Sequence, residues 1–114
     1  MSRELLVAST AGTVIYAVAR IAAGDNFGLW FNNADNGIVA FEAAAWNRYA
    51  IPMTELGTTG LFEADMPELL LNERAIDIYY VTQAGATPAL GDTRISGKLY
   101  EMQDEFVPVK SLAV

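Results

Sequence analysis

The sequence predicts an all-β fold: an antiparallel β-sandwich of seven or eight short strands, immunoglobulin-like or transthyretin-like. Short runs of β-branched and aromatic residues recur along the chain, and turns rich in glycine, asparagine and aspartate separate them about every 8–12 residues. Several of these runs alternate between apolar and polar residues, as half-buried strands do. Only Ala43–Tyr49 has a helical composition, which predicts one short helical turn.

A hairpin is predicted over Met53–Pro67, M-T-E-L-G-T-T-G-L-F-E-A-D-M-P. Gly57 and Gly60 bracket two threonines, and glycine reaches the positive φ values of a tight reversal at low cost. From Phe62 to Met66 the residues alternate, so apolar side chains share one face and Glu63 and Asp65 share the other. Residues 68–73 are expected to form an irregular connection.

Five further runs are predicted to be strands. A β-branched segment, Val14–Ile21, is apolar on both faces except at Arg20, which predicts a central strand covered on both sides or packed on a partner subunit. The clearest alternation lies in Arg74–Gln83, and the sheet is expected to close with Thr93–Met102. Shorter strands are predicted at Gly28–Asn32 and Ile38–Phe41.

Length and composition restrict the class of protein. A chain of 114 residues forms one domain that buries roughly two-thirds of its unfolded surface, and a hydrophobic content of 53% excludes a disordered tail. No apolar run approaches the ~20 residues that span a bilayer, so no membrane partner is expected. The start of the chain lacks the pattern of a secretory signal.

Charge and missing residue types argue against several functions. Seven basic and fourteen acidic residues give a net charge of −7, and the basic residues are scattered, so nucleic acid is not an expected partner. The chain has no cysteine and no histidine, which removes thiol chemistry, the commonest general base and the usual zinc ligand. Glu63 and Asp65, about 7 Å apart on one strand face, are expected to solubilise that face. We therefore expect neither an enzyme nor a cofactor.

Two binding alternatives remain open. The segment Asp25–Gly37 is rich in oxygen ligands of the kind that calcium takes, but its spacing fails at Ala34, and turn formation explains its composition better. Aromatic residues, with Trp30 and Phe31 as the candidate ligand-binding pair, offer a platform for sugar rings, although the aromatics of a small sandwich usually fill its core.

The two ends of the chain suggest an assembly role. We divide the chain into an N-terminal arm or first strand (1–12), a sandwich domain (13–102) and a C-terminal arm (103–114). Apolar ends on an acidic domain need burial, either on their own core or against neighbouring subunits. The predicted interface residues are Leu5, Leu6, Val7, Phe106, Val107, Val109 and Leu112.

Four motifs carry a resemblance to a known group of proteins. They are T-V-I-Y-A-V-A-R at Thr13–Arg20, A-F-E-A at Ala40–Ala43, T-E-L-G-T-T-G-L-F at Thr54–Phe62 and Y-V-T-Q-A-G-A-T-P-A-L-G-D at Tyr80–Asp92. In this order they resemble small β-sandwich domains found among tailed-phage structural proteins and in some bacterial proteins.

Two positions depart from the pattern of that family. Phe62 stands where the hairpin of the relatives has a tyrosine, and Trp30 is separated from Asn36-Gly37 by an insertion. The motifs consist of turn and core residues, so the resemblance implies a fold and brings no catalytic residues. It implies a virion component, made in the host cytoplasm, whose partners are copies of itself and neighbouring virion proteins. The alternative is a carbohydrate- or cell-surface-binding module.

Overall fold

The computed structural model describes residues 4–101, and it is an all-β antiparallel sandwich with one short helical layer. Among these residues there are nine strands and three helical segments. In chain order they are β1 (Glu4–Ala8), β2 (Ile15–Ala23), β3 (Trp30–Asn32), β4 (Gly37–Val39), the 3-10 helix η1 (Ala43–Ala45), α1 (Trp46–Tyr49), β5 (Ile51–Pro52), β6 (Thr54–Glu55), β7 (Leu61–Asp65), the 3-10 helix η2 (Glu68–Asn72), β8 (Ala75–Thr82) and β9 (Thr93–Glu101).

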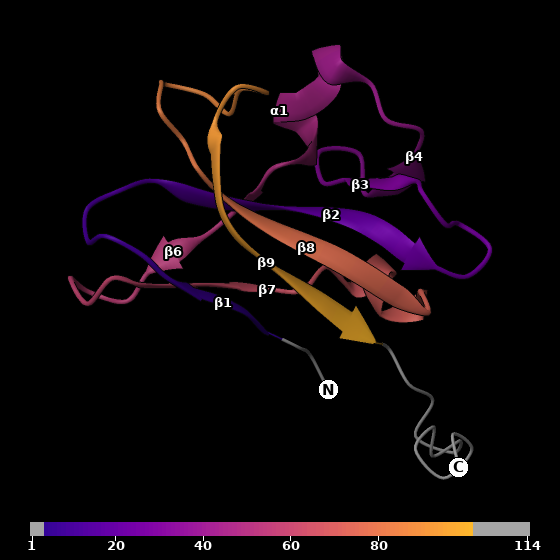
Figure 1. Cartoon of the computed structure of the whole chain (residues 1–114), viewed down its shortest axis with the longest axis horizontal. Coiled ribbons are helices and arrows are strands. Elements are labelled where there is room, and N and C mark those ends of the chain that lie inside the picture. Colours follow the sequence, from indigo (N-terminus) through magenta and orange to yellow (C-terminus); the bar gives the residue numbers. More distant parts are fainter. Residues whose placement is uncertain (1–3, 102–114) are drawn as a thin grey trace, which may run out of the picture.

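The strands form two sheets of unequal size. The larger sheet has the order β4-β3-β2-β8-β9, and β5 pairs with β2 on the edge that β3 also uses; the smaller sheet has the order β1-β7-β6. Every pairing is antiparallel. Figure 1 shows α1 and the β3–β4 hairpin on one side of β2, with β1 and β7 on the other. The predicted fold class is confirmed.

The main core lies between the two sheets. From the small sheet, Leu5, Val7 and Phe62 point inward because alternate residues of a strand share a face. They meet the inward face of β2 and β8, and Leu70 of η2 closes one end of this core. The inward-facing residues of the two central strands are Ile15, Ala17, Ala19, Ile21, Ile76, Ile78 and Tyr80.

A second, smaller core covers the opposite face of the larger sheet. There Tyr16, Val18 and Val81 pack with Tyr49 of α1, and all four side chains are buried. Because β2 contributes to both cores, its residues from Ile15 to Ala19 are all buried. The expectation that Val14–Ile21 is a central strand covered on both sides is confirmed, and the second cover comes from the chain's own helical layer.

The hairpin is present as predicted, with β6 and β7 joined by a turn in which Gly57 has φ 63° and Gly60 has φ 79°. Gly60 also lies against the end of β1, where the backbone N–H of Ser9 donates a 2.8 Å hydrogen bond to the Gly60 carbonyl. A Cβ at Gly60 would lie 2.5 Å from the Ser9 carbonyl oxygen. This position needs glycine for its conformation and for the space.

Two details differ from the sequence prediction. Nine strands are present where seven or eight were expected, because Ile51–Pro52 and Thr54–Glu55 each pair over two residues as the chain crosses between the sheets. Residues 68–72, expected to be irregular, form η2, which is held by the hydrogen bond from Leu70 N–H to the Pro67 carbonyl.

Among the described residues no helix is long and apolar enough to cross a membrane.

Candidate functional site

Trp30, which the sequence offers for sugar binding, belongs to a self-packed cluster of five aromatic side chains. Trp30 is at its centre, with ring centroids 5.1 Å from Phe41 and 6.1 Å from Tyr49. Trp46 and Tyr79 complete the cluster, each 6.1 Å from Trp30. The rings mostly meet at tilted or edge-on angles, which favour attraction between rings but leave no common flat face. Phe41 is 42% exposed, Trp30, Trp46 and Tyr79 are partly buried, and Tyr49 is buried.

The candidate ligand-binding pair Trp30 and Phe31 is split between the two faces of the sheet. Adjacent residues of a strand point to opposite faces, so Trp30 joins the aromatic cluster while Phe31 enters the main core with 1% of its surface exposed. This corrects the expectation that the two act together. Phe31 is not available to a large ligand such as a sugar.

A chain of hydrogen bonds links the helical layer, the central strand and the β8–β9 loop. The indole N–H of Trp46 donates to the Tyr16 hydroxyl at 2.8 Å, and that hydroxyl donates to a carboxylate oxygen of Asp92 at 2.8 Å. Asp92 also accepts the backbone N–H groups of Ala89 (2.9 Å) and Ala84 (3.2 Å). The loop therefore folds back toward α1, as Figure 1 shows.

The pKa shifts of Tyr16 and Asp92, the two ionisable groups in this chain of hydrogen bonds, indicate a structural role for both. Burial and the neighbouring Asp92 carboxylate raise the pKa of Tyr16 to about 12, although the hydrogen bond from Trp46 opposes this shift. Partial burial acts to raise the pKa of Asp92, but hydrogen bonds from Ala89, Tyr16 and Ala84 outweigh it and the net shift is downward. A phenol with a raised pKa and a carboxyl with a lowered one are poorly suited to proton transfer near neutral pH.

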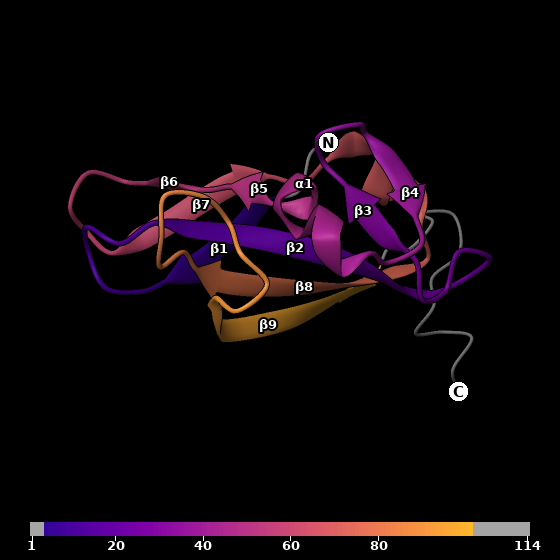
Figure 2. The ribbon, with the colours of Figure 1, turned by 90° about the horizontal axis from the view of Figure 1, so that it is seen from above.

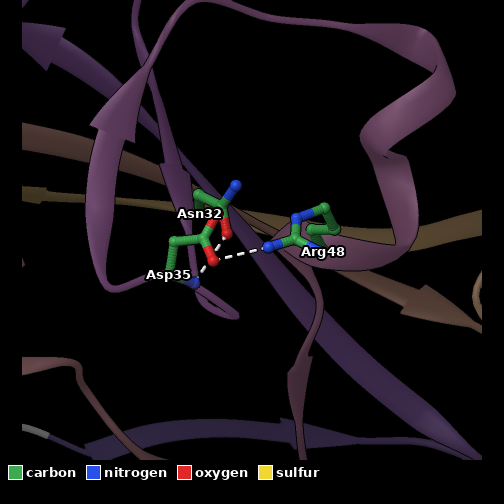
Figure 3. A network of polar contacts seen from close by, with 3 residues as sticks. All are labelled: Asn32, Asp35 and Arg48. Carbon is green, nitrogen blue, oxygen red and sulfur yellow. Dashed lines mark hydrogen bonds and ion pairs between the residues drawn. The ribbon is translucent and has the colours of Figure 1, made fainter.

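The Asx-rich segment uses its polar groups within the chain. The Asn32 side-chain oxygen accepts the backbone N–H of Asp35 at 2.9 Å, and the Asp35 carboxylate pairs with Arg48 of α1, as Figure 3 shows. Asn26 donates to Glu73 at 2.9 Å. Over residues 4–101 no group of three or more histidine, cysteine, aspartate or glutamate side chains is placed to hold a metal ion. These residues act as turn formers in the structure.

The acidic pair Glu63 and Asp65 lies on the outer face of the small sheet. Partial desolvation, a hydrogen bond that protonated Glu63 donates to Glu4, and repulsion from the Glu4 and Asp65 carboxylates together raise the pKa of Glu63. Asp65 borders an open hollow of about 450 Å³ that Glu63 does not line. The pair therefore does not converge on one cleft, as two carboxylates in acid–base catalysis would.

The predicted interface residues divide into three groups. Leu5 and Val7 are buried in the main core, since β1 pairs with β7 over its full length. This corrects the expectation that they face neighbouring subunits. Leu6, on the opposite face of β1, is 53% exposed and stays available. Phe106, Val107, Val109 and Leu112 lie outside the described residues.

The outer edge of the larger sheet is formed by β9. It is nine residues long, as long as β2, yet eight of its nine residues are exposed and only Tyr100 is buried. In the described part of the chain it pairs with β8 alone, and Figure 2 shows it along the margin of the sheet. Ile95 and Leu99, with 38% and 55% of their surfaces exposed, are apolar side chains on this strand. The sequence predicts a strand here, but only the strand order shows that it is an edge.

Comparisons of the chain with protein-family models, with curated proteins and with solved structures gave no match.

Proposed function

We propose that this chain is a non-enzymatic structural protein that acts through subunit–subunit contacts, as a component of a tailed-phage virion in head decoration, neck or tail. The observation that carries the assembly role is the edge strand β9. Among residues 4–101 this long strand pairs with β8 alone, and the backbone N–H and C=O groups of its other edge are a template for another strand. The virion setting rests on the motifs that resemble tailed-phage structural domains.

Other features of the chain support a role in binding to proteins. The aromatic cluster packs on itself, and two of its polar groups, the Trp46 indole N–H and the Tyr49 hydroxyl, form hydrogen bonds within the same chain. Leu6 adds an exposed apolar side chain on the outer face of the small sheet. Apolar side chains in exposed positions gain burial when a neighbour arrives.

Sedimentation velocity of the full chain over a wide concentration range tests the assembly role. We expect a discrete oligomer whose fraction grows with concentration, and we expect Leu99→Lys to weaken it. Leu90→Lys is the matched control, because Leu90 is 53% exposed but lies in the β8–β9 loop rather than on the edge strand. A full chain that stays monomeric at all concentrations would contradict the proposal, as would equal effects of the two substitutions.

The virion setting needs a separate test. Antibodies raised against the purified chain should label particles from a phage whose genome encodes it, and electron microscopy would place the label on head, neck or tail. Label found only in the soluble fraction of the lysed host would contradict a virion role.

A further inference from the structure

The outer edge of β9 has a sequence that fits its own copy. Around Gly97 the strand reads Ile95-Ser96-Gly97-Lys98-Leu99, so two apolar residues flank the glycine at equal distances on either side. Gly97 pairs with Tyr79 and Leu99 pairs with Asp77 on β8, which puts both on the face of the second core. The register shift between Tyr80 and Val81 leaves Ile95 opposite no single β8 residue, next to Arg94.

We infer that two copies of this chain pair antiparallel through β9, about a twofold axis at Gly97, and join their larger sheets into one. This inference rests on the proposed function. It specifies the partner, a second copy of the chain, and the contact, strand β9. In this register Ile95 of one copy faces Leu99 of the other, twice, and the small Ser96 faces Lys98. The contact is isologous, so it closes as a dimer and leaves neither β9 edge open.

Charge and side-chain pairing select this register over its neighbours. Centring the axis on Ser96 would place Ile95 opposite Gly97 and Leu99 opposite Thr93, so the apolar side chains would not meet, and centring it on Lys98 would place two lysines face to face. Directly opposed like charges destabilise a strand pair. Centring it on Ile95 or on Leu99 would leave the other apolar side chain without a partner.

The ends of the paired strands are also complementary. Antiparallel pairing brings the N-terminal end of β9, which carries Arg94, beside the C-terminal end of the partner strand, which carries Glu101. The guanidinium of Arg94 lies 4.6 Å from the Tyr79 ring centroid, on the face where the ring also covers Gly97. No proline interrupts the nine residues, so all their outward-facing N–H groups are available to donate to a partner strand.

Cysteine cross-linking tests the register, because the chain has no cysteine of its own. In the dimer an Ile95→Cys copy and a Leu99→Cys copy place their cysteines directly opposite, within the Cα separation of roughly 4.4–6.8 Å that a disulfide accepts. Two identical copies place their cysteines about 13 Å apart, four residues along the strand. We therefore expect a disulfide dimer when the two variants are mixed, and none from either variant alone.

The outcomes separate this inference from the proposed function. Cross-linking by either variant alone, or by Leu90→Cys mixed with Leu99→Cys as readily as by the designed pair, would overturn the register. A discrete oligomer in sedimentation without a 95–99 cross-link would overturn this dimer and leave an assembly role standing. A monomer that never cross-links would remove both.

A charge-complementation experiment provides a second, independent readout. Ile95→Lys and Leu99→Glu should each fold as the parent does, because both side chains are exposed in the single chain. Each alone should lower the dimer fraction, and mixing the two should restore it, because each mixed dimer has one Lys–Glu pair across the axis and keeps one unchanged Ile95–Leu99 pair. Restoration would support the proposed register, and its absence in two folded variants would overturn it.

Discussion

At the scale of single residues, a few side chains connect parts of the chain that are far apart in sequence. Tyr16 joins Trp46, 30 residues away, to Asp92, 76 residues away, through one hydroxyl. Tyr49 holds the loop before η1 by accepting the backbone N–H of Glu42 at 2.8 Å. These tyrosines are buried, yet each hydroxyl has a partner, as buried polar groups require.

Asp92→Asn should destabilise the protein at neutral pH and have less effect in acid. The native fold lowers the Asp92 pKa from its ordinary value of 3.8, so the ionised form stabilises the fold above about pH 4 and this contribution is lost as pH falls through the lower, native value. Hydrogen bonds to an ionised group of this exposure contribute about 1–2 kcal/mol. Urea unfolding of parent and variant at pH 7 and pH 3 measures the difference.

The exposed Asp25→Asn is the control for Asp92→Asn, and it should change the unfolding free energy by less than about 0.5 kcal/mol at either pH. A loss at Asp92 that is as large at pH 3 as at pH 7 would show that its charge does not hold the loop.

Gly60→Ala should destabilise the fold more than Gly57→Ala does. Both glycines have positive φ, which costs an alanine about 1–2 kcal/mol, but nothing lies within 4 Å of a Cβ at Gly57. At Gly60 the added Cβ meets the Ser9 carbonyl oxygen at 2.5 Å, and the end of β1 would have to shift, for a total cost of roughly 2–4 kcal/mol. Thermal unfolding of both variants compares them directly, and equal losses would mean that β1 is not fixed against this turn.

At the scale of elements, the pairing of β1 with β7 determines which of its side chains could contact another subunit. All five of its residues pair with β7, and its inward side chains complete the main core. A segment used in this way serves as a strand of the domain, and only its outer face is free for a neighbour.

Leu5→Ala and Leu6→Ala separate these two roles of β1. Leu5 is fully buried, so its truncation should cost about 2–5 kcal/mol of unfolding free energy. Leu6 is half exposed, and its truncation should change stability by about 0.5 kcal/mol or less, while it weakens any association that uses this face. Denaturant titration with sedimentation of the same samples distinguishes these outcomes. Equal stability of the two variants would show that β1 detaches readily.

At the scale of the whole molecule, one central pair of strands supports two cores. β2 and β8 pack against the small sheet on one face and against the helical layer on the other. Neither cover is large, and each relies on the same two strands for its packing surface. The two cores should therefore unfold together.

Fluorescence offers a direct check of this coupling, because Trp30 and Trp46, the two tryptophans of the chain, both pack at the second core. Thermal unfolding followed by tryptophan emission should have the same midpoint as unfolding followed by far-ultraviolet circular dichroism, which reports on all strands. An earlier fluorescence transition would show that the helical layer separates before the sandwich unfolds.

The sequence by itself determined the local structure: the hairpin at Met53–Pro67, the two-sided strand at Val14–Ile21 and the helical turn at Ala43–Tyr49. The alternation of side chains along a strand and the positive φ values of glycine depend on a few neighbouring residues, so the sequence is enough to predict them. The tertiary structure alone decided which strand is an edge, which core Trp30 and Phe31 each enter, and that Leu5 and Val7 face inward. Those outcomes depend on the pairing of strands that are distant in sequence. A strand with one solvent-exposed face has the same alternation of apolar and polar residues whether it pairs with its own chain or with another copy.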